Sequence, residues 1–265
     1  IIYTPTGRLD DFTPYTRARA VLSLWAGVER IIDNPTLTQP LARMADAGLA
    51  EGMREWVAGQ VLRHHLALDL DICRATPDWV PRTQPLARDR QVGILGLGAL
   101  GQAVAGALVG LGFAVSGWSR REKTLPGVAC HAGAGGLARV LEKSEILVLL
   151  LPLTGATESI MNAPNLRLLP KGAVLINPGR GGLIDDAALI AALDAGQLSH
   201  ATLDVFRSEP LPKEHPFWRH PKVTVSPHIA APTRPEIAAR QVVENIRRAE
   251  AGEALLNLVD RAAGY

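Results

Sequence analysis

Three side chains in the second half of the chain bring together a guanidinium, a carboxylate and an imidazole: Arg180, Glu209 and His228. Histidine titrates near neutral pH, so His228 is a candidate for giving a proton to a developing alkoxide. Glu209 is a candidate for orienting that imidazole through its opposite charge. Arg180 stands between glycines and suits bidentate capture of a carboxylate, with polarisation of an adjacent carbonyl oxygen. The set fits reduction of a 2-oxo acid, provided that a hydride donor binds nearby.

Taken singly, each of these residues has a plainer interpretation. A glycine-flanked arginine is as often an exposed loop residue, a loop glutamate is usually solvated, and a loop histidine is commonly structural. The combination favours catalysis, because the three residues follow three different predicted strands, at 173–177, 201–205 and 223–225. Ligands of parallel α/β sheets bind outside the carboxyl ends of the strands, so we expect the three side chains to meet at one edge.

A hydride donor is predicted from the glycine-rich stretch after the apolar run 92–95. Gly96, Gly98 and Gly101 have the G-x-G-x-x-G spacing, between that predicted strand and a helix that runs to Leu111. The first glycine permits a tight turn, the second lets the backbone approach a pyrophosphate, and the third allows the helix to pack closely on the sheet. Free N–H groups at the helix N-terminus suit phosphates. The alternative is a glycine-rich turn that binds nothing.

The end of the next predicted strand, 114–118, indicates which dinucleotide binds. An NAD site usually has a carboxylate there, on the ribose hydroxyls. This chain has Ser119, Arg120 and Arg121 instead, a hydroxyl and two guanidinium groups that suit a 2′-phosphate. We therefore expect NADP(H) to be preferred, with NAD(H) possible; the alternative is an exposed basic turn.

The composition excludes several classes of protein. The chain has 265 residues, 47% of them hydrophobic, and a net charge of +2 with nearly balanced acids and bases. One or two domains are expected, with no basic face for nucleic acid and no polybasic or membrane-spanning segment. Cys73 and Cys130 do not form a disulfide framework, so we expect both to be reduced core residues of a cytoplasmic protein.

Alternating strands and helices predict a doubly wound parallel sheet in the middle of the chain. Beyond the glycine motif, we expect one more strand at 145–151 and helices at 137–143, within 154–169, and at 186–195, the last capped by Asp185. The first 50 residues, with short strands at 20–24 and 41–45, indicate a smaller α/β domain.

Two further helices are predicted outside this alternation. Residues 51–74 show a broad apolar stripe typical of one long helix, for which core packing and a subunit interface are both reasonable uses. His64 and His65 lie on it; adjacent residues point to different faces, so we interpret them as structural or surface residues. Near the C-terminus, Thr233 and Glu236 form the pattern of a capping box at the start of the last helix.

The motifs together resemble the D-isomer-specific 2-hydroxyacid dehydrogenase family over essentially the whole chain. The resemblance rests on six stretches: Gly96-Leu97-Gly98-Ala99-Leu100-Gly101, Leu151-Pro152-Leu153-Thr154, Asn177 to Ile184, Leu203-Asp204-Val205-Phe206, Glu209-Pro210-Leu211 and Pro227-His228-Ile229-Ala230. Within the family, Trp118-Ser119-Arg120, residues 228–235 and the closing residues 259–265 most resemble the glyoxylate/hydroxypyruvate reductases of type A.

The resemblance implies a Rossmann dinucleotide domain at 51–235 and a discontinuous, flavodoxin-like substrate domain at 1–50 with 236–265. It implies a catalytic triad of Arg180, Glu209 and His228, and NADPH-dependent reduction of small 2-oxo acids, glyoxylate and hydroxypyruvate first. It implies cofactor contacts at Gly96, Gly98, Ala99, Leu100, Gly101, Ser119, Arg120, Arg121, Leu151, Pro152, Asn177, Pro178, Asp204 and Ala230.

For the substrate, the resemblance implies contacts at Trp25, Ala26, Gly27, Arg180 and His228, in which the backbone amides of Ala26 and Gly27 bind its carboxylate alongside Arg180. Trp25 stands where a small residue is frequent in the family, which would narrow the pocket. A homodimer is implied, in which Trp79 matches a tryptophan that reaches a partner's pocket; the alternative is an aromatic residue packed on its own domain. The chain lacks the family's first strand and helix and does not begin with Met, so we expect a truncation at the N-terminus.

Other functions remain open from the sequence. The fold also serves dinucleotide-sensing binding proteins that resemble this family, and the triad argues against that class only modestly. Another 2-hydroxyacid dehydrogenase specificity is a third interpretation, such as that of a 3-phosphoglycerate or formate dehydrogenase. The NADP-type strand end and the lack of a regulatory domain disfavour the 3-phosphoglycerate enzyme.

Overall fold

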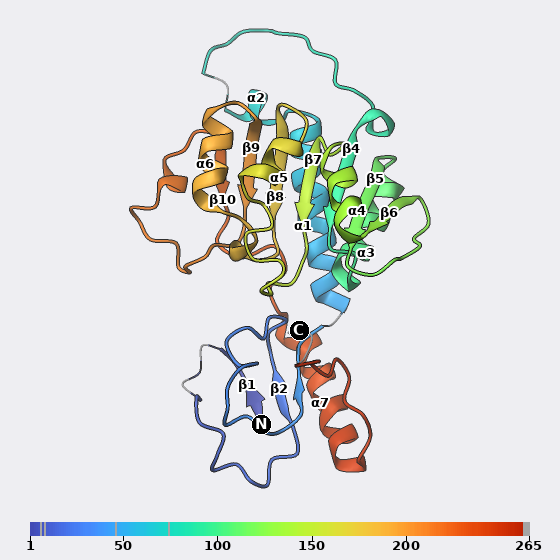
Figure 1. Cartoon of the computed structure of the whole chain (residues 1–265), viewed down its shortest axis with the longest axis vertical. Coiled ribbons are helices and arrows are strands. Elements are labelled where there is room, and N and C mark those ends of the chain that lie inside the picture. The colour runs from blue at the N-terminus through green and yellow to red at the C-terminus, as the bar shows by residue number, and fades with distance from the viewer. Residues whose placement is uncertain (6, 8, 46, 74, 262–265) are drawn as a thin grey trace. The chain divides into compact units, whose positions relative to one another are not determined.

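The computed structural model describes residues 1–5, 7, 9–45, 47–73 and 75–261 and divides the chain into two compact units (Figure 1). Unit 1 is formed by Ile1–Glu51 and Ala231–Tyr265, and unit 2 by Gly52–Ala230. Within the described ranges, no helix is long and apolar enough to cross a membrane.

Unit 2 is built on a seven-stranded sheet with the order β10-β9-β8-β7-β4-β5-β6, in which every neighbouring pair is parallel. This confirms the predicted doubly wound parallel sheet. The strands are β4 (Gln91–Leu95), β5 (Ala114–Ser119), β6 (Val128–Ala132), β7 (Ile146–Leu149), β8 (Ala173–Asn177), β9 (Leu198–Leu203) and β10 (Val223–Val225).

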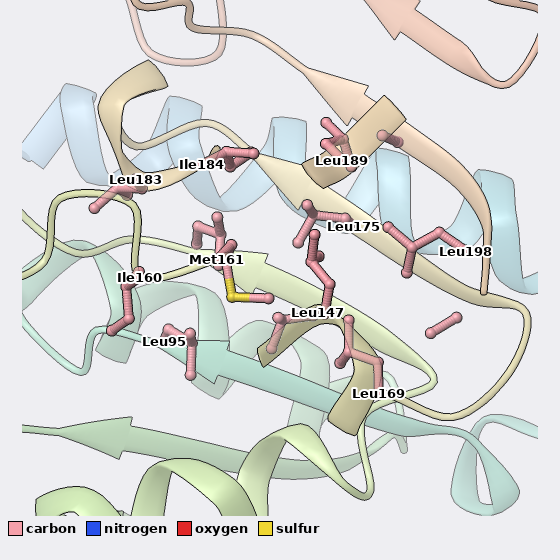
Figure 2. Packing of buried hydrophobic residues seen from close by; sticks show 14 of the residues in the cluster. Leu95, Leu147, Ile160, Met161, Leu169, Leu175, Leu183, Ile184, Leu189 and Leu198 are labelled. Atoms are coloured by element: carbon pink, nitrogen blue, oxygen red, sulfur yellow. The ribbon is translucent and has the colours of Figure 1, made fainter. Parts of the chain in front are cut away.

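The central strands are apolar on both faces because both faces are covered. All residues of β7 and β8 are buried, as expected for parallel strands between two helical layers. Figure 2 shows Leu147 and Leu175 of these strands among Leu169, Leu189 and other apolar side chains of the main core. Burying one such leucine contributes about 2 kcal/mol, so this core anchors the strand ends that carry the site.

The helices of unit 2 begin and end mostly at residues that explain their limits. Asp185 caps the sixth helix by accepting a hydrogen bond from the amide of Ala188 at 3.0 Å, as predicted, and Gly196 follows its end with φ +69°. The elements are α1 (Ala47–His65), α2 (Asp69–Ile72), α3 (Ala99–Gly110), α4 (Gly133–Leu141), α5 (Ala163–Leu168) and α6 (Asp186–Asp194), with 3₁₀ turns η1 (Ala87–Asp89), η2 (Gly181–Leu183) and η3 (Pro216–Trp218).

The prediction of one helix over 51–74 was wrong. Helix α1 begins earlier and ends at His65, and a turn separates it from the four residues of α2; the predicted last residue, Arg74, lies outside the described residues. Ala67 in this turn has φ +51°, which a continuous α-helix does not allow. The apolar periodicity continues through the turn, so periodicity alone could not reveal the break.

Two elements beside the glycine motif were misjudged from the sequence. Strand β6 was not predicted, because only partly buried and exposed residues compose it. Helix α4 begins at Gly133 rather than at Leu137, since its first turn is rich in glycine, which is a poor helix former.

Unit 1 contains a three-stranded parallel sheet with the order β1-β2-β3 and one long helix, α7 (Pro235–Ala251). The strands are β1 (Ile2–Tyr3), β2 (Val21–Ser23) and β3 (Leu41–Ala42), so the third is shorter than the predicted 41–45. The predicted capping box was wrong: Arg234 is the N-cap and Pro235 opens the helix, while the Thr233 hydroxyl donates to the carbonyl of Leu24 at 3.0 Å.

The predicted environments of the two cysteines and of His64 and His65, none of which was assigned a chemical role, can be compared with the structure. Cys73 is exposed and Cys130 partly exposed, both as free thiols, so the expectation of two core cysteines was wrong. His65 is buried against Phe113, with ring centroids 5.0 Å apart, and His64 lies 5.0 Å from the ring of His200. The structural interpretation of the two adjacent histidines is confirmed.

Candidate active site

The three predicted catalytic residues follow three neighbouring strands that end at the same level. In the sheet register, Leu203 of β9 pairs with Asn177 of β8 on one side and with Val225 of β10 on the other. Arg180 lies three residues beyond β8, Glu209 lies on the loop after β9, and His228 lies three residues beyond β10. The structure therefore places all three on one edge of the sheet, as the strand assignments predicted.

His228 and Glu209 form a direct pair. The imidazole Nδ1 lies 2.7 Å from Oε2 of Glu209, while Oε1 accepts a hydrogen bond from the amide of Phe206 at 2.9 Å. A carboxylate only accepts, so Nδ1 carries the proton of this bond and Nε2 is left for a ligand. The His228 side chain is 49% exposed.

The loop that carries His228 is held by the buried carboxylate of Asp204. Its Oδ1 accepts from the Ser226 hydroxyl at 2.5 Å and from the Ile229 amide at 3.0 Å, and its Oδ2 accepts from the Ala230 amide at 2.9 Å. The His228 amide donates to the Asp204 carbonyl at 2.9 Å, with His228 itself at φ +54°. Both oxygens of Asp204, predicted to contact the cofactor, thus bind the loop backbone or its serine first.

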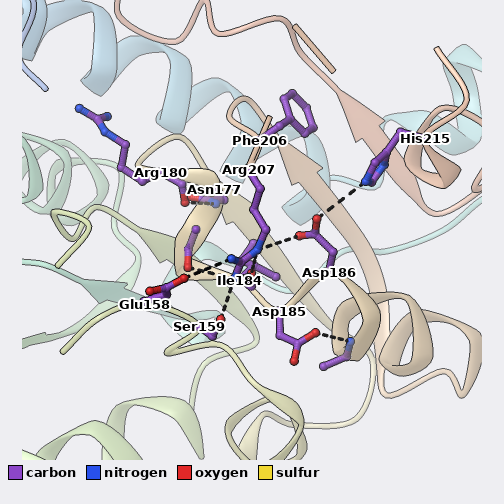
Figure 3. Close-up of polar contacts among 12 residues, drawn as sticks. Glu158, Ser159, Asn177, Arg180, Ile184, Asp185, Asp186, Phe206, Arg207 and His215 are labelled. Atoms are coloured by element: carbon purple, nitrogen blue, oxygen red, sulfur yellow. Dashed lines mark hydrogen bonds and ion pairs between the residues drawn. The ribbon is translucent and has the colours of Figure 1, made fainter. Parts of the chain in front are cut away.

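The turn that carries Arg180 is held in a similar way by a buried amide. Asn177 is fully buried; its Nδ2 donates to the Arg180 carbonyl at 2.9 Å, and its Oδ1 accepts from the Gly179 amide at 3.1 Å. Nη1 of Arg180 donates to the Gly179 carbonyl at 2.7 Å. These bonds hold the backbone of the turn. Arg180 itself is half-buried, and its guanidinium extends away from Arg207 in Figure 3.

The glycine turn between β4 and α3 leaves room for a pyrophosphate. Gly96 has φ +108°, and a Cβ at Gly101 would overlap the carbonyl oxygen of Gly96, so both positions require glycine for the fold. A Cβ at Gly98 would meet nothing within 4 Å. The fold itself therefore does not require glycine at position 98. A ligand on the N-terminus of α3, which no side chain caps, would require it, and the site fits a dinucleotide.

The predicted 2′-phosphate residues lie at the end of β5. Arg120 and Arg121 are exposed, whereas Ser119 is buried and its hydroxyl donates to the Arg121 carbonyl at 2.7 Å. Sequence analysis did not single out Lys123, whose Nζ donates to the carbonyl of Leu97 within the glycine turn at 2.6 Å. A hollow of about 470 Å³ adjoins this loop; it is lined by Glu122, Lys123, Thr124, Cys130, His131, Ala132, Gly135, Gly136 and Arg139. The sequence did contain a signal for Lys123, because it is the third cation after β5, two positions beyond Arg121.

The remaining predicted cofactor residues also lie on the carboxyl edge of the sheet. Ala99 and Leu100 open α3, Leu151 and Pro152 follow β7, Pro178 follows β8, and Ala230 is buried after β10. This is the edge at which ligands of open α/β sheets bind.

In unit 1, the predicted substrate residues form the loop after β2. Ser23 Oγ and the carbonyl of Trp25 lie 3.2 Å apart, and that carbonyl also accepts from the Met44 amide at 3.1 Å. Among the described residues, no acceptor faces the amide nitrogens of Ala26 and Gly27. This loop therefore offers two neighbouring donors for an anion.

Comparison with known proteins decides the family. The profile described as D-isomer specific 2-hydroxyacid dehydrogenase, NAD binding domain, matches residues 61–230. The chain belongs to the D-isomer-specific 2-hydroxyacid dehydrogenase family. Its recognition from the sequence motifs is thereby confirmed, as is the fold class.

Relatives within the family resemble this chain over most of its length. A glyoxylate/hydroxypyruvate reductase A of Yersinia enterocolitica is 42% identical over 256 residues, which are 93% of this chain and 82% of that protein. A family member of Xanthobacter autotrophicus Py2, solved in complex with NADPH and MES, is 43% identical with a TM-score of 0.92, covering 96% of this chain and 81% of that one. The NADPH-dependent glyoxylate/hydroxypyruvate reductase of Sinorhizobium meliloti, solved with NADP and sulfate, is 40% identical with a TM-score of 0.88, covering 93% and 80%.

Proposed function

We propose that this chain is an NADPH-dependent reductase of small 2-oxo acids, with glyoxylate and hydroxypyruvate as its first substrates. The observation that carries the proposal is the His228–Glu209 pair, 2.7 Å apart and accessible at the strand ends of a dinucleotide fold. The names of the relatives support the substrate class, because proteins about 40% identical to this chain are called glyoxylate/hydroxypyruvate reductases.

The residues divide the reaction between them. Arg180 binds the substrate carboxylate and polarises the neighbouring keto oxygen. Gly96, Gly98 and Gly101 would hold the dinucleotide, whose reduced nicotinamide would supply the hydride that the keto carbon requires. His228 gives a proton from Nε2 to the oxygen as negative charge develops there, and Glu209 stabilises the imidazolium and keeps its ring oriented through Nδ1. The ring then regains a proton from water, since its side chain is accessible.

The cofactor preference rests on the loop after β5. Arg120 and Arg121 are exposed and no carboxylate stands at the end of β5, an arrangement that suits a 2′-phosphate. Lys123 adds a third cation beside the glycine turn. Relatives solved with NADPH or NADP support the same preference.

For unit 1, we propose that the amides of Ala26 and Gly27 bind a carboxylate group, because no described residue accepts from them. Trp25, which is 39% exposed, limits the size of the 2-oxo acid that this loop accepts. Small substrates such as glyoxylate are therefore favoured over those with long side chains.

We also propose a homodimer in the cytoplasm. Trp79 is 92% exposed, so packing on its own unit does not account for it, and the next residue, Val80, and Ile72 of α2 are exposed as well. Such an apolar segment suits burial by a second copy of the chain. The two free thiols are consistent with a reducing compartment. Size-exclusion chromatography with light scattering tests the dimer, and Trp79→Ser should weaken it.

The deciding experiment follows the absorbance of reduced nicotinamide with glyoxylate, hydroxypyruvate and pyruvate, using NADPH and then NADH. We expect turnover of the first two substrates with a clear preference for NADPH. Preference for NADH would contradict the role given to Arg120 and Arg121 while leaving the reaction in place. Tight NADPH binding without turnover of any 2-oxo acid would instead favour a dinucleotide-sensing binding protein.

A further inference from the structure

The turn that carries Arg180 and the turn that carries Glu209 are packed backbone against backbone. A Cβ atom at Gly181 would overlap the carbonyl carbon of Phe206 and the amide nitrogen of Arg207, so only glycine permits this approach. Close packing limits how near the two turns come, but it is not directional and does not fix their alignment. Alignment requires hydrogen bonds across the contact.

Arg207 makes those hydrogen bonds (Figure 3). Its Nε and Nη2 both donate to the carbonyl oxygen of Ile184, at 3.0 and 2.6 Å, and Nη2 also lies 3.3 Å from the carbonyl oxygen of Gly182. Gly182 belongs to η2, the 3₁₀ turn that begins one residue after Arg180, and Ile184 follows it. One guanidinium thus joins the segment that holds Glu209 to the segment that holds Arg180.

The same guanidinium also reaches the loop that follows β7. Nη2 donates to the Ser159 hydroxyl at 2.6 Å, and Nη1 lies 3.5 Å from Oε1 of Glu158. That loop is bound to η2 directly, because the Ser159 amide donates to the carbonyl of Gly182 at 2.8 Å. Arg207 therefore lies at the junction of three loops, which come from the carboxyl ends of three adjacent strands.

The acidic side chains around Arg207 keep its charge compensated. Oδ1 of Asp186 lies 3.9 Å from Nε of Arg207, and Oδ2 of Asp186 lies 3.8 Å from Nε2 of His215 (Figure 3). Burial raises the pKa of Asp186, and the charge of Arg207 acts in the opposite direction. A neutral residue at position 207 would remove both the fork of donors and the counter-charge of this carboxylate.

We propose that Arg207 is a positioning residue, whose guanidinium sets the separation between Arg180 and the Glu209–His228 pair. The inference rests on the function proposed above, in which Arg180 holds the substrate and His228 gives the proton. Arg207 acts through its neighbour Phe206, whose amide donates to Oε1 of Glu209 at 2.9 Å. A displacement of about 1 Å between a bound substrate and a catalytic group can cost ~100-fold in rate, so the alignment matters for turnover.

Kinetics of Arg207→Ala and Arg207→Lys test the proposal. Lysine keeps the charge but replaces the planar fork by a single ammonium, which cannot bind two carbonyls and a hydroxyl together. We expect both variants to lose about 10- to 100-fold in kcat, with KM for glyoxylate and Kd for NADPH changed less than about threefold.

Added guanidinium ion should restore part of the kcat of Arg207→Ala and none of that of Arg207→Lys. The matched control is Arg219→Ala, an exposed arginine after η3, with wild-type kcat.

A double-mutant cycle separates positioning from general stability. In a His228→Ala background the group to be aligned is gone, so Arg207→Ala should cost little further activity. A wild-type kcat in Arg207→Ala, or the same fold-loss with and without His228, would overturn the proposal.

Hydrogen exchange gives a readout that does not depend on turnover. In Arg207→Ala, the amide of Phe206 should exchange faster, because the hydrogen bond that it donates to Glu209 is no longer held in place. Unchanged protection there would contradict the inference even if the wild type reduced no 2-oxo acid. Faster exchange in an enzyme without such activity would instead contradict the proposed function alone.

Discussion

The loops after β8 and β10 and the loop after β5 lie on one edge of the same sheet, but they are held in different ways. On the side proposed to carry out catalysis, buried Asn177 and Asp204 bind the backbone of the loops that carry Arg180 and His228. On the side proposed to bind the 2′-phosphate, Arg120 and Arg121 are exposed. Proton transfer tolerates little displacement, whereas attraction between charges falls slowly with distance. Fully buried side chains therefore hold the backbone on the side where atoms must meet, and exposed cations suffice on the other.

The largest effect should come from removing the proton donor. His228→Ala should lower kcat by about 100- to 10,000-fold, because general acid catalysis is lost, while Kd for NADPH stays nearly unchanged. Single-turnover absorbance and titration of NADPH fluorescence measure the two quantities. The control is His220→Ala, whose imidazole lies before β10 and pairs with Asp194 at 3.2 Å. Near-normal turnover of His228→Ala would refute the assigned mechanism.

A smaller effect is expected from loosening the catalytic side without removing a reacting group. Asp204→Asn keeps the shape but replaces one acceptor by a donor, which would face an amide, so a buried hydrogen bond is lost at ~1–3 kcal/mol. We expect kcat to fall about 10- to 100-fold and the free energy of unfolding to fall with it. Steady-state rates measure the change in kcat, and urea denaturation measures the change in the free energy of unfolding. A change in KM without a change in kcat would contradict this role.

On the phosphate side, the same kind of change should affect binding rather than rate. Replacing Arg120 and Arg121 together by alanine should raise Kd for NADPH about 10- to 100-fold and leave Kd for NADH nearly unchanged, because only NADPH carries the 2′-phosphate. Calorimetry with both cofactors at two salt concentrations measures this difference. Equal weakening of both cofactors would show that these arginines do not read the 2′-phosphate.

The smallest effect on the rate is expected from the support beneath the loops that carry Glu209 and His228, where the change is one of stability. Burial lowers the pKa of His64 to about 3 and that of His200 to about 4, and each Nε2 lies near a threonine hydroxyl, Thr202 at 2.9 Å and Thr224 at 2.8 Å. The positive charge of Arg63 lowers both pKa values further, and that of His220 lowers the His200 value, while Asp69 opposes.

Because these folded-state pKa values lie below the ordinary 6.5, the unfolded chain binds more protons, and stability falls as pH falls below about 6.5. Between pH 7 and pH 5, the wild type should lose roughly 3–4 kcal/mol more than a His64→Gln/His200→Gln variant. Urea denaturation at each pH measures the difference. Parallel pH profiles would contradict the buried neutral pair.

The sequence predicted the site better than it predicted the supports of the site. Strand ends and glycine spacing are local patterns, so the sequence alone could predict that Gly96, Gly98, Gly101 and the residues after β8, β9 and β10 lie on one edge of the sheet. The role of Asp204 in the His228 loop depends on bonds between residues more than 20 positions apart. Arg207 was missed for the same reason, because nothing in its neighbours along the chain indicates contacts with Ile184 and Ser159.

The errors in the fold have a similar origin. The break after His65 is not visible in a continuous apolar stripe, and β6 was missed because it lacks the fully buried pattern of the central strands. Thr233 has the residue type of a cap but donates to Leu24, a contact between the two ends of unit 1. The local rule did identify the cap at Asp185, whose side chain accepts from the amide of Ala188 three residues further on.

The two outer strands of the large sheet bear on self-association. Strand β10 has three residues and is followed by Ser226 and Pro227, and proline has no N–H to offer a further strand. Strand β6 has five partly buried or exposed residues rather than a flat apolar row. Short or irregular outer strands are poor templates for adding a strand from another molecule. The sheet itself is thus protected against edge-to-edge aggregation, and concentrated protein should stay free of fibrils.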